Sequence, residues 1–291
     1  MKLKFWGTRG LISSPSKDTA VYGGNTSCIQ LEHKNQVVII DTGFGACNLG
    51  EELMQRILND GENLQIHIFY THFHWDHIQG LPFFHPIYFE STTINIYSPL
   101  PVNVAHSNLN LLFDGSYSPF AGIDSMASAI SFHQLTTPVL VDGITVDSIP
   151  LDHGQNNEEG VESHCFALRF RNSKNQKFVI ATDHEARPSE INSKLIEFAS
   201  DADILVHDAQ YTQEEYKTRI GWGHSTFLQA VENARKAKVK KVLLTHHHPQ
   251  RSDSDLDAIA SKMHADPRFN AINFEFAKES KSYGSDEKDP K

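Results

Sequence analysis

Residues 66–77 read Ile-His-Ile-Phe-Tyr-Thr-His-Phe-His-Trp-Asp-His, in which an apolar run passes directly into a cluster of polar side chains. The run 66–70 is short and rich in β-branched and aromatic residues, which favours a buried strand. His72 and His74 point the same way if the chain stays extended beyond this strand, because side chains alternate along it. Asp76 and His77 follow in a turn and can face a second position. Four potential ligands in this short segment therefore predict a metal site at the end of the strand.

The ligand types in this cluster narrow the choice of metal. Imidazole nitrogens and carboxylate oxygens without thiolate suit Zn2+, and Mn2+ or Fe2+ accept the same ligands. The cysteines Cys28, Cys47 and Cys165 are scattered and form no Cys-x-x-Cys motif, which argues against a thiolate zinc site or a disulfide framework. The alternative for residues 72–77 is a loop of solvated polar residues. Such a loop does not explain why these residues adjoin a core strand with two aromatic residues between them.

One segment cannot saturate two cations, so further ligands are expected at the ends of other strands. His153 follows the apolar run 144–149, Asp183 follows 178–181, and His246 follows 242–244. Each of these alone is weak evidence, because a histidine at a strand end is more often structural or solvated. Their occurrence together with residues 72–77 predicts that all of them meet at one rim of a sheet.

The rest of the chain alternates between strand-like and helix-like segments. Strands are predicted at 2–6, 27–32, 36–40, 94–97, 131–135, 144–149, 164–170, 177–181, 204–207, 241–244 and 272–276, and helices at 50–59, 189–200, 225–237 and 254–264. Ser225 is expected to cap the third helix, and Ser252 with Asp255 forms a capping-box pattern at the fourth. Strands followed by helices in both halves favour a two-layered α/β sandwich. We predict one domain over 1–277, with 82–135 as an insertion or lid and 278–291 as a disordered tail.

The composition of the chain indicates which size and charge of substrate it is expected to bind. The chain has 291 residues, with 26 basic and 36 acidic side chains and a formal net charge of -10. A strongly acidic surface disfavours adhesion to a polyanion, so a small substrate is favoured over a large nucleic acid, although a local basic patch would escape this average. The sequence shows no apolar run long enough for a membrane span and no signal peptide at its N-terminus. A cytoplasmic protein is therefore expected.

The motif His-x-His-x-Asp-His at 72–77, followed by His153, Asp183 and His246, resembles the metallo-β-lactamase fold, and the resemblance covers residues 5 to about 259. More narrowly, the chain resembles the phosphodiesterase branch that includes ribonuclease Z. Residues 207–209 (His-Asp-Ala) with Tyr211 and Thr212, and residues 223–226 (Gly-His-Ser-Thr), are similar to the His-Glu-Ala-Thr and His-Ser-Thr segments of ribonuclease Z. Residues 6–10 and 23–27 resemble small bacterial members described as cyclic-nucleotide phosphodiesterase-like. The resemblance implies an α/β fold, a four-layer αββα sandwich with the metals at one edge.

The resemblance also implies how the metals are held. One divalent cation would be bound by His72, His74 and His153, the other by Asp76, His77 and His246, and Asp183 would bridge the two. Asp41 is implied as a buried acceptor that steadies the 72–77 loop rather than as a ligand. The implied cofactor is a pair of Zn2+ ions, with Mn2+ or Fe2+ as alternatives.

The chemistry expected of such a site is phosphodiester hydrolysis. Two cations roughly 3.5–4 Å apart can hold a bridging hydroxide and a phosphoryl oxygen together, and they lower the pKa of the water to about 7. The leaving alkoxide then needs a proton, for which His224, oriented by Asp208, is the candidate donor. The predicted catalytic residues are thus Asp76, Asp208 and His224. Ribonuclease Z has glutamate where this chain has Asp208, and the plain alternative for His224 is a residue that merely precedes a helix.

Several other polar residues are expected to have no direct role. His247 and His248 flank His246 but cannot face the same metal, so they are expected to support the ligands or to lie at the surface. Surface or internally satisfied positions are predicted for His85, His106, His133, His164 and His184. Arg9 is expected either to reach a phosphate or to be a solvated loop arginine.

These patterns favour a phosphodiesterase for a small phosphodiester such as a cyclic nucleotide. One alternative is tRNA 3′ processing, for which no basic arm is apparent in the sequence and the net charge is unfavourable. A second is hydrolysis of a lactone, thioester or β-lactam on the same metals, and a third is a metal-binding sensor or scaffold without turnover. Residues 82–135 are expected to shape the pocket or to form a contact in a homodimer.

Overall fold

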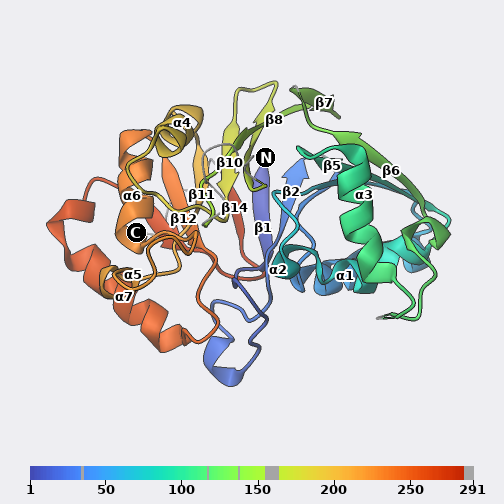
Figure 1. Ribbon diagram of the computed structural model, residues 1–291, viewed down its shortest axis with the longest axis horizontal. Helices are drawn as coiled ribbons and strands as arrows, with labels where there is room; N and C mark the ends of the chain where they lie inside the picture. Colours follow the sequence, from blue (N-terminus) through green and yellow to red (C-terminus); the bar gives the residue numbers. More distant parts are fainter. Residues whose placement is uncertain (34–35, 117, 137, 155–163, 285–291) are drawn as a thin grey trace.

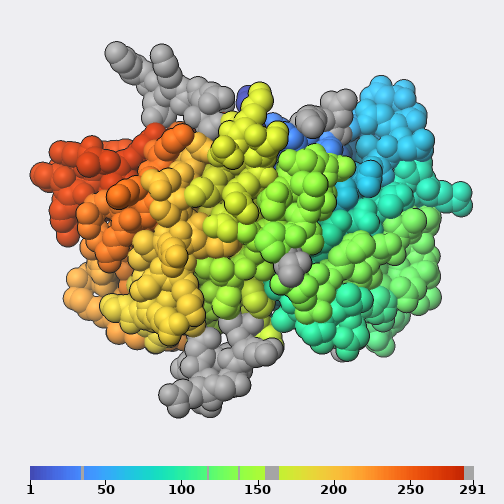
Figure 2. Space-filling view, turned by 90° about the horizontal axis from the view of Figure 1, so that it is seen from above, coloured from blue at the N-terminus to red at the C-terminus, as the bar shows by residue number. Residues whose placement is uncertain are grey.

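The computed structural model describes residues 1–33, 36–116, 118–136, 138–154 and 164–284. In this part of the chain the strands form two sheets that pack face to face, with helices on both outer faces (Figure 1). The layers follow the order helix, sheet, sheet, helix, which confirms the predicted four-layer αββα sandwich. The part of the chain coloured cyan to green and the part coloured orange to red lie on opposite sides of the molecule (Figure 2).

The first sheet combines an antiparallel and a parallel part in the strand order β14-β1-β2-β3-β4-β5-β6. Strands β3 to β6 run parallel to one another, whereas β1 is antiparallel to both of its neighbours. The strands are β1 (Lys2–Gly7), β2 (Cys28–His33), β3 (Gln36–Ile40), β4 (Leu64–Phe69), β5 (Thr92–Ser98), β6 (Ala129–Gln134) and β14 (Ser282–Gly284).

The second sheet repeats this plan in the order β13-β12-β11-β10-β9-β8-β7. Strands β10 to β13 are parallel, and β7 to β10 are antiparallel neighbours. The strands are β7 (Val139–Val141), β8 (Ile144–Pro150), β9 (Phe166–Asn172), β10 (Lys177–Ala181), β11 (Ile204–Asp208), β12 (Lys241–Thr245) and β13 (Phe274–Phe276).

Helices close the two outer faces. α1 (Gly45–Asp60) and α3 (Val102–Asn110) lie on the side of the first sheet, and α4 (Glu190–Phe198), α6 (Phe227–Lys236) and α7 (Asp253–Ala265) on the side of the second. The short helices α2 (Trp75–Ile78) and α5 (Gln213–Tyr216) lie in the connections. Among the described residues, no helix combines the length and apolar character that a membrane span requires.

Three buried apolar clusters hold the four layers together. One fills the space between the sheets, where the rings of Phe69 and Phe170 meet edge to face with centroids 5.5 Å apart. A second packs the first sheet against α1, through residues such as Leu49 and Leu53. The third packs the second sheet against α4, α6 and α7, through residues such as Leu195. The central strands β3, β10 and β12 face a core on both sides, so their sequences are almost continuously apolar rather than alternating.

The helix N-termini confirm one predicted cap and correct the other. Ser252 caps α7, and its capping box with Asp255 is present. The predicted cap at Ser225 is wrong, because Thr226 occupies that position on α6 and forms a capping box with Gln229. The Ser225 hydroxyl instead donates to the carbonyl of His184 and accepts from the amide of Ala186. Ser225 therefore ties two loops together rather than starting a helix.

The predicted disordered tail is wrong in its first part. Residues 282–284 form β14, which pairs antiparallel with β1, and Tyr283 is fully buried. The polar composition of this stretch conceals the strand, because Tyr283 is the only buried residue of the three. The remainder of the predicted tail, 285–291, lies outside the described residues.

Residues 82–135 contribute two strands to the first sheet. β5 pairs with β4, and β6 forms the outer edge of the sheet beside β5. Between these strands the chain forms α3 and several short 3-10 helices, including one at Leu111–Phe113. These strands belong to the sandwich itself, while a lid role for the intervening residues stays a prediction.

Candidate metal centre

The predicted ligands follow the ends of four strands at one edge of the sandwich. β4 leads into the 72–77 loop, β8 into His153, β10 into Asp183 and β12 into His246. β8, β10 and β12 point the same way, since β8 and β10 are both antiparallel to β9, and β10 and β12 are both parallel to β11. The structure brings all seven predicted ligands together at this edge.

A first group comprises His72, His74 and His153, whose potential ligand atoms all lie within 4.8 Å of one another. The closest approach is between Nε2 of His153 and Nδ1 of His74, at 3.0 Å. The other ring nitrogen of His153 contacts the carbonyl oxygen of Gly223 at 2.8 Å, which fixes the orientation of the imidazole. Such a contact on the far nitrogen is typical of a histidine that is oriented to bind a metal.

A second group comprises Asp76, His77 and His246. Nε2 of His246 lies 3.1 Å from Oδ2 of Asp76, and Nε2 of His77 lies 3.5 Å from the same oxygen. Asp183 stands between the two groups. Its carboxylate lies 3.1 Å from both His77 and His246 and 3.7 Å from His153.

The donor set fits divalent cations because several buried polar atoms at its centre lack a hydrogen-bond partner. These atoms are Nε2 of His72, Nε2 of His77 and Oδ2 of Asp183, of which the last two lie 3.1 Å apart without the geometry of a hydrogen bond. A buried polar atom without a partner is costly, so three of them directed at one place indicate that they serve as ligands. The fold and this cluster together indicate a binuclear site for divalent metal ions.

Burial and neighbouring charges set the ionisation of these side chains. Burial lowers the pKa of His72 well below its usual range and that of His153 to about 4, so both imidazoles are neutral at neutral pH. Burial opposes the charge of His246 as well, but the carboxylates of Asp183 and Asp76 outweigh it and raise its pKa to about 9. The histidinium neighbours in turn hold the pKa of Asp183 well below its usual range, despite burial. Metal binding at His246 would therefore release a proton.

Contacts from outside the ligand set hold the ligands in place. As the resemblance implied, Asp41 is a buried acceptor: it receives hydrogen bonds from the amide and hydroxyl of Thr71, and it contacts Nδ1 of His77 at 2.8 Å. Nε2 of Gln210 lies 3.0 Å from Nδ1 of His246. The backbone amide of Leu11 donates to Oδ2 of Asp76 at 2.7 Å.

The Leu11 contact depends on the glycine that precedes it. A Cβ atom on Gly10 would lie 2.2 Å from Cε1 of His246, so only glycine lets this segment lie against the imidazole. Leu11 itself adopts a left-handed conformation with φ 67°, a strained arrangement for a leucine. The loop between β1 and β2 thus lies directly against the second group of ligands.

The predicted proton donor lies beside the second group. Nδ1 of His224 contacts Oδ2 of Asp208 at 2.6 Å, and both residues are buried. The imidazole of His224 stacks on that of His246 with centroids 4.8 Å apart. Asp208 also accepts hydrogen bonds from the backbone amides of Gln210 and Ser225, so its carboxylate is held from several directions. The shorter side chain of aspartate therefore reaches His224 in this chain.

The loop that carries His224 is fixed by a carboxylate that the sequence reasoning missed. Glu185 is fully buried and accepts hydrogen bonds from the amides of Gly221 and Gly223 and from the hydroxyl of Tyr216. Gly223 contacts His153 through its carbonyl, so Glu185 supports a predicted ligand and the predicted proton donor together. Its position two residues after Asp183 is the only sequence signal, and glutamate is mostly exposed in proteins.

Both predictions for Arg9, a contact to phosphate and a solvated loop position, are wrong. Its side chain is fully buried and donates to the carbonyls of Gly23, His248 and Arg251, so it neither reaches toward a phosphate nor lies in solvent. The buried guanidinium group thus serves as a hydrogen-bond donor to backbone carbonyls of the surrounding loops. His247 is buried and contacts the carbonyl of Ala277, and His184 is buried against Asn192, as expected for satisfied histidines.

Comparison with known proteins gives a family match. The model of the β-lactamase superfamily domain matches residues 36–247. Among curated relatives, the ribonuclease Z of Streptococcus suis is 28% identical, over 89% of this chain and 93% of its own length. The ribonuclease Z of Archaeoglobus fulgidus is 27% identical, over 84% and 86% respectively.

Solved structures show the same fold. The metallo-β-lactamase fold protein YhfI from Bacillus subtilis superposes with a TM-score of 0.66 at 18% identity, covering 97% of this chain and 99% of that one. The short form of human tRNase Z gives 0.64 at 18% identity, covering 98% and 99%. Yeast PDE1 gives 0.65 at 15% identity, covering 97% and 98%. These likenesses confirm the fold expected from the 72–77 motif.

Proposed function

The chain belongs to the β-lactamase superfamily and is a metal-dependent hydrolase of phosphodiester bonds. On that premise we propose that it cleaves a small phosphodiester such as a cyclic nucleotide. The proposed cofactor is a pair of Zn2+ ions. His72, His74 and His153 would hold one of them, Asp76, His77 and His246 would hold the other, and the carboxylate of Asp183 would serve both.

The residues around the cations would have separate tasks. When bound, a pair of divalent cations supplies a water of lowered pKa and offsets negative charge on the phosphoryl oxygens. His224 holds the proton for the leaving oxygen on Nε2, because its Nδ1 is occupied by the carboxylate of Asp208. Gln210 and Asp41 keep the imidazoles of His246 and His77 in position through their Nδ1 atoms.

The observation that carries this proposal is the buried pair of Asp208 and His224 against His246. A metal-binding sensor has no use for an oriented imidazole beside its ligands. Hydrolysis of a lactone or thioester also gives no reason for this second, carboxylate-held histidine. A phosphodiester does, because its leaving alkoxide is strongly basic and departs more easily with a proton.

A small substrate is favoured over RNA by the charge of the chain. The net charge is -10, and several arginines near the site are already bound within the chain. Arg187 bonds to Asp152, Arg251 to Glu215, and Arg9 to backbone carbonyls. These guanidinium groups are therefore not available to hold a polyanionic backbone.

Processing of tRNA is the second candidate function, because the curated relatives carry the name ribonuclease Z. They match over most of the chain, and the short human tRNase Z shares the fold. The proposal and this alternative differ in substrate size rather than in chemistry.

One set of assays separates the two functions. Zinc-loaded protein is incubated with cyclic AMP, with bis-p-nitrophenyl phosphate and with a precursor tRNA at low salt, each with and without a chelator. We expect chelator-sensitive hydrolysis of the two small substrates and no tRNA cleavage. Cleavage of the precursor tRNA without turnover of cyclic AMP would favour the second function, and no turnover of any substrate would contradict both.

A further inference from the structure

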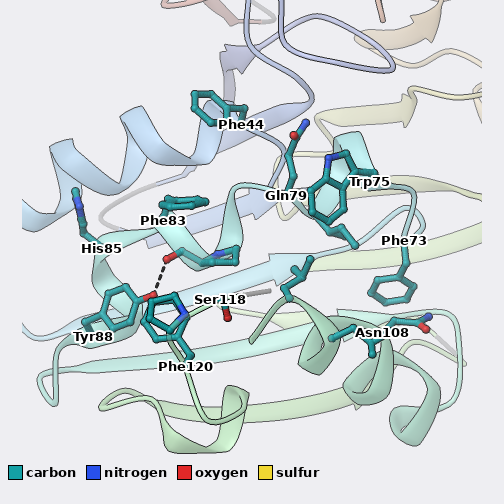
Figure 3. Close-up of a pocket in the computed structure, with 15 residues that line it drawn as sticks. Phe44, Phe73, Trp75, Gln79, Phe83, His85, Tyr88, Asn108, Ser118 and Phe120 are labelled. Carbon is teal, nitrogen blue, oxygen red and sulfur yellow. Dashed lines mark hydrogen bonds between the residues drawn. The ribbon is translucent and has the colours of Figure 1, made fainter. Parts of the chain in front are cut away.

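An apolar groove lies on the helical side of the first sheet, and the 72–77 loop and α2 form part of its wall (Figure 3). Its volume is about 1030 Å³, which is sufficient for a nucleotide-sized ligand. Aromatic rings dominate its walls: Phe44, Phe73, Trp75, Phe83, Tyr88 and Phe120. In Figure 3 Trp75 and Phe73 lie toward one end of the groove, and His85 and Tyr88 toward the other.

The groove begins at the loop that carries four of the predicted ligands. Phe73 lies between His72 and His74, and Trp75 lies between His74 and Asp76. Trp75 is the first residue of α2 and is 62% exposed, and Gln79, directly after this helix, also lines the groove. The groove and the metal centre therefore share the 72–77 loop, which supplies wall residues to the groove and predicted ligands to the metal centre.

The walls carry almost no charge. The described lining residues include no lysine, arginine, aspartate or glutamate. The hydroxyl of Tyr88 donates to the carbonyl of Pro82 at 2.5 Å, and burial raises the pKa of this tyrosine to about 12, which keeps it neutral. A polyanionic backbone would find no counter-charge in such a groove, whereas a neutral group would lose little hydration energy on entering it.

Several of the wall side chains are exposed, although they are large and apolar. Phe83 is 60% exposed, Leu111 61% and Phe44 41%. Exposed apolar side chains that gather along one hollow indicate a binding site, whereas scattered ones do not. The rings of Tyr88 and Phe120 stack on one another, with centroids 5.4 Å apart and an angle of 28° between their planes. The carboxamides of Gln79 and Asn108 add a few polar groups among the rings.

We propose that this groove binds a flat, uncharged aromatic group of the substrate, of the nucleobase class, while the attached phosphodiester lies at the metal centre. The rings supply stacking surfaces. The carboxamide of Asn108 can pair with polar atoms on the edge of the base, and so can the carboxamide oxygen of Gln79, whose Nε2 donates to the hydroxyl of Thr26. This inference rests on the proposed function, which it narrows from small phosphodiesters to those that carry a nucleobase.

The test measures binding directly, so that it does not depend on turnover. Calorimetric titration of the zinc-loaded protein compares adenosine 5′-monophosphate with ribose 5-phosphate, which has the same phosphate and sugar but no base. We expect the nucleotide to bind at least about tenfold more tightly. Phe83→Ala and Phe44→Ala should each weaken nucleotide binding about fivefold or more and leave ribose 5-phosphate unchanged. Leu58→Ala is the matched control, because Leu58 is 60% exposed on α1 and does not line the groove.

Each result has a defined meaning. Equal affinity of the wild-type protein for the two ligands, or unchanged nucleotide binding in both phenylalanine variants, would overturn the inference. An apolar groove could instead form the contact of a homodimer, which sedimentation of the same variants detects. A dimer that dissociates in the Phe83→Ala variant, with nucleotide affinity unchanged, would also overturn the inference. Failure of the proposed function is separate, since it appears as absent hydrolysis of bis-p-nitrophenyl phosphate while the base-dependent binding remains.

Discussion

At the scale of single residues, Glu185 links the two halves of the site through one loop. Its buried carboxylate receives the amides of Gly221 and Gly223, and Gly223 in turn orients His153 and directly precedes His224. Both oxygens of a carboxylate are hydrogen-bond acceptors, and all three partners of Glu185, two backbone amides and a tyrosine hydroxyl, are donors. The geometry makes Glu185 a positioning residue for the predicted proton donor.

Glu185→Gln tests this positioning role. The amide group of glutamine would face a backbone N–H, so one hydrogen bond is lost and the loop shifts. Because such a mismatch typically costs 1–3 kcal/mol, we expect kcat to fall about tenfold with little change in KM. The pH profile of kcat should shift as well, since His224 loses its fixed place beside Asp208. Glu214→Gln, on an exposed side chain of the same region, is the control. A pH profile identical to the wild type would contradict the role.

His224→Ala tests the proton donor itself through the leaving group. Loss of a general acid costs about 100-fold or more in kcat for cyclic AMP, whose leaving alkoxide is strongly basic. Bis-p-nitrophenyl phosphate should lose far less, because p-nitrophenolate departs without a proton. Steady-state kinetics on both substrates measure the difference, with exposed His133→Ala as the control. An equal loss on both substrates would assign His224 a structural role instead.

A site residue could be predicted from the sequence when it lies just after the end of a predicted strand. The seven predicted ligands directly follow apolar strands, and parallel strand ends meet at one edge, so their convergence could be inferred from spacing. Glu185, Gln210 and Arg9 could not be placed in this way. Whether a long polar side chain is buried depends on which backbone groups the tertiary structure presents to it, and sequence spacing does not contain that information.

At the scale of elements, β14 shows how a short strand depends on one side chain. Tyr283 is fully buried, its ring meets that of Phe5 edge to face at 5.6 Å, and its hydroxyl accepts from the amide of Lys278 at 3.0 Å. β14 extends the first sheet beyond β1 and so covers an edge that would otherwise be open.

Replacement of Tyr283 measures what this strand contributes. Tyr283→Ala leaves a cavity between β14 and the sheet, and we expect the free energy of unfolding to fall by roughly 3–5 kcal/mol. Tyr283→Phe keeps the ring and loses one hydrogen bond, so it should cost only about 1 kcal/mol. Urea unfolding of the two variants and the wild type gives both values. A Tyr283→Ala protein as stable as Tyr283→Phe would show that β14 is dispensable.

Most elements could be predicted because each is an apolar run of characteristic length. The predicted strand 177–181 and the capping box at Ser252 agree with the structure. The predicted helix 50–59 begins later than α1, which starts at Gly45. The reason is that Gly45 and Cys47 give no helical signal and that no side chain caps this helix. Pairing of β14 with β1 joins the two ends of the chain, and composition alone does not reveal a contact of such long range.

At the scale of the whole molecule, the metal centre lies where the two sheets meet. The 72–77 loop extends from the first sheet, while His153, Asp183 and His246 extend from the second. Bound cations would therefore link the two halves of the sandwich, and their binding free energy would add to the stability of the fold.

Metal removal should accordingly lower the melting temperature. At a metal concentration of about 1,000 times Kd, linkage contributes about 4 kcal/mol for each site, and a chelator removes this contribution. Calorimetry with and without chelator measures the shift, and added Zn2+ should restore the original value. Asp183→Asn is the matched variant, because the loss of the shared carboxylate weakens both sites and should make the chelator effect much smaller. An unchanged melting temperature in chelator would contradict this link between the halves.

Seven side chains from both sheets are proposed to hold a pair of metal ions at one edge of the sandwich. Anomalous X-ray scattering from crystals of the zinc-loaded protein, recorded at the zinc absorption edge, tests it most directly. We expect two peaks about 3.5–4 Å apart, one against His72, His74 and His153 and one against Asp76, His77 and His246, with Asp183 contacting both. A single peak, or peaks located away from these residues, would contradict it.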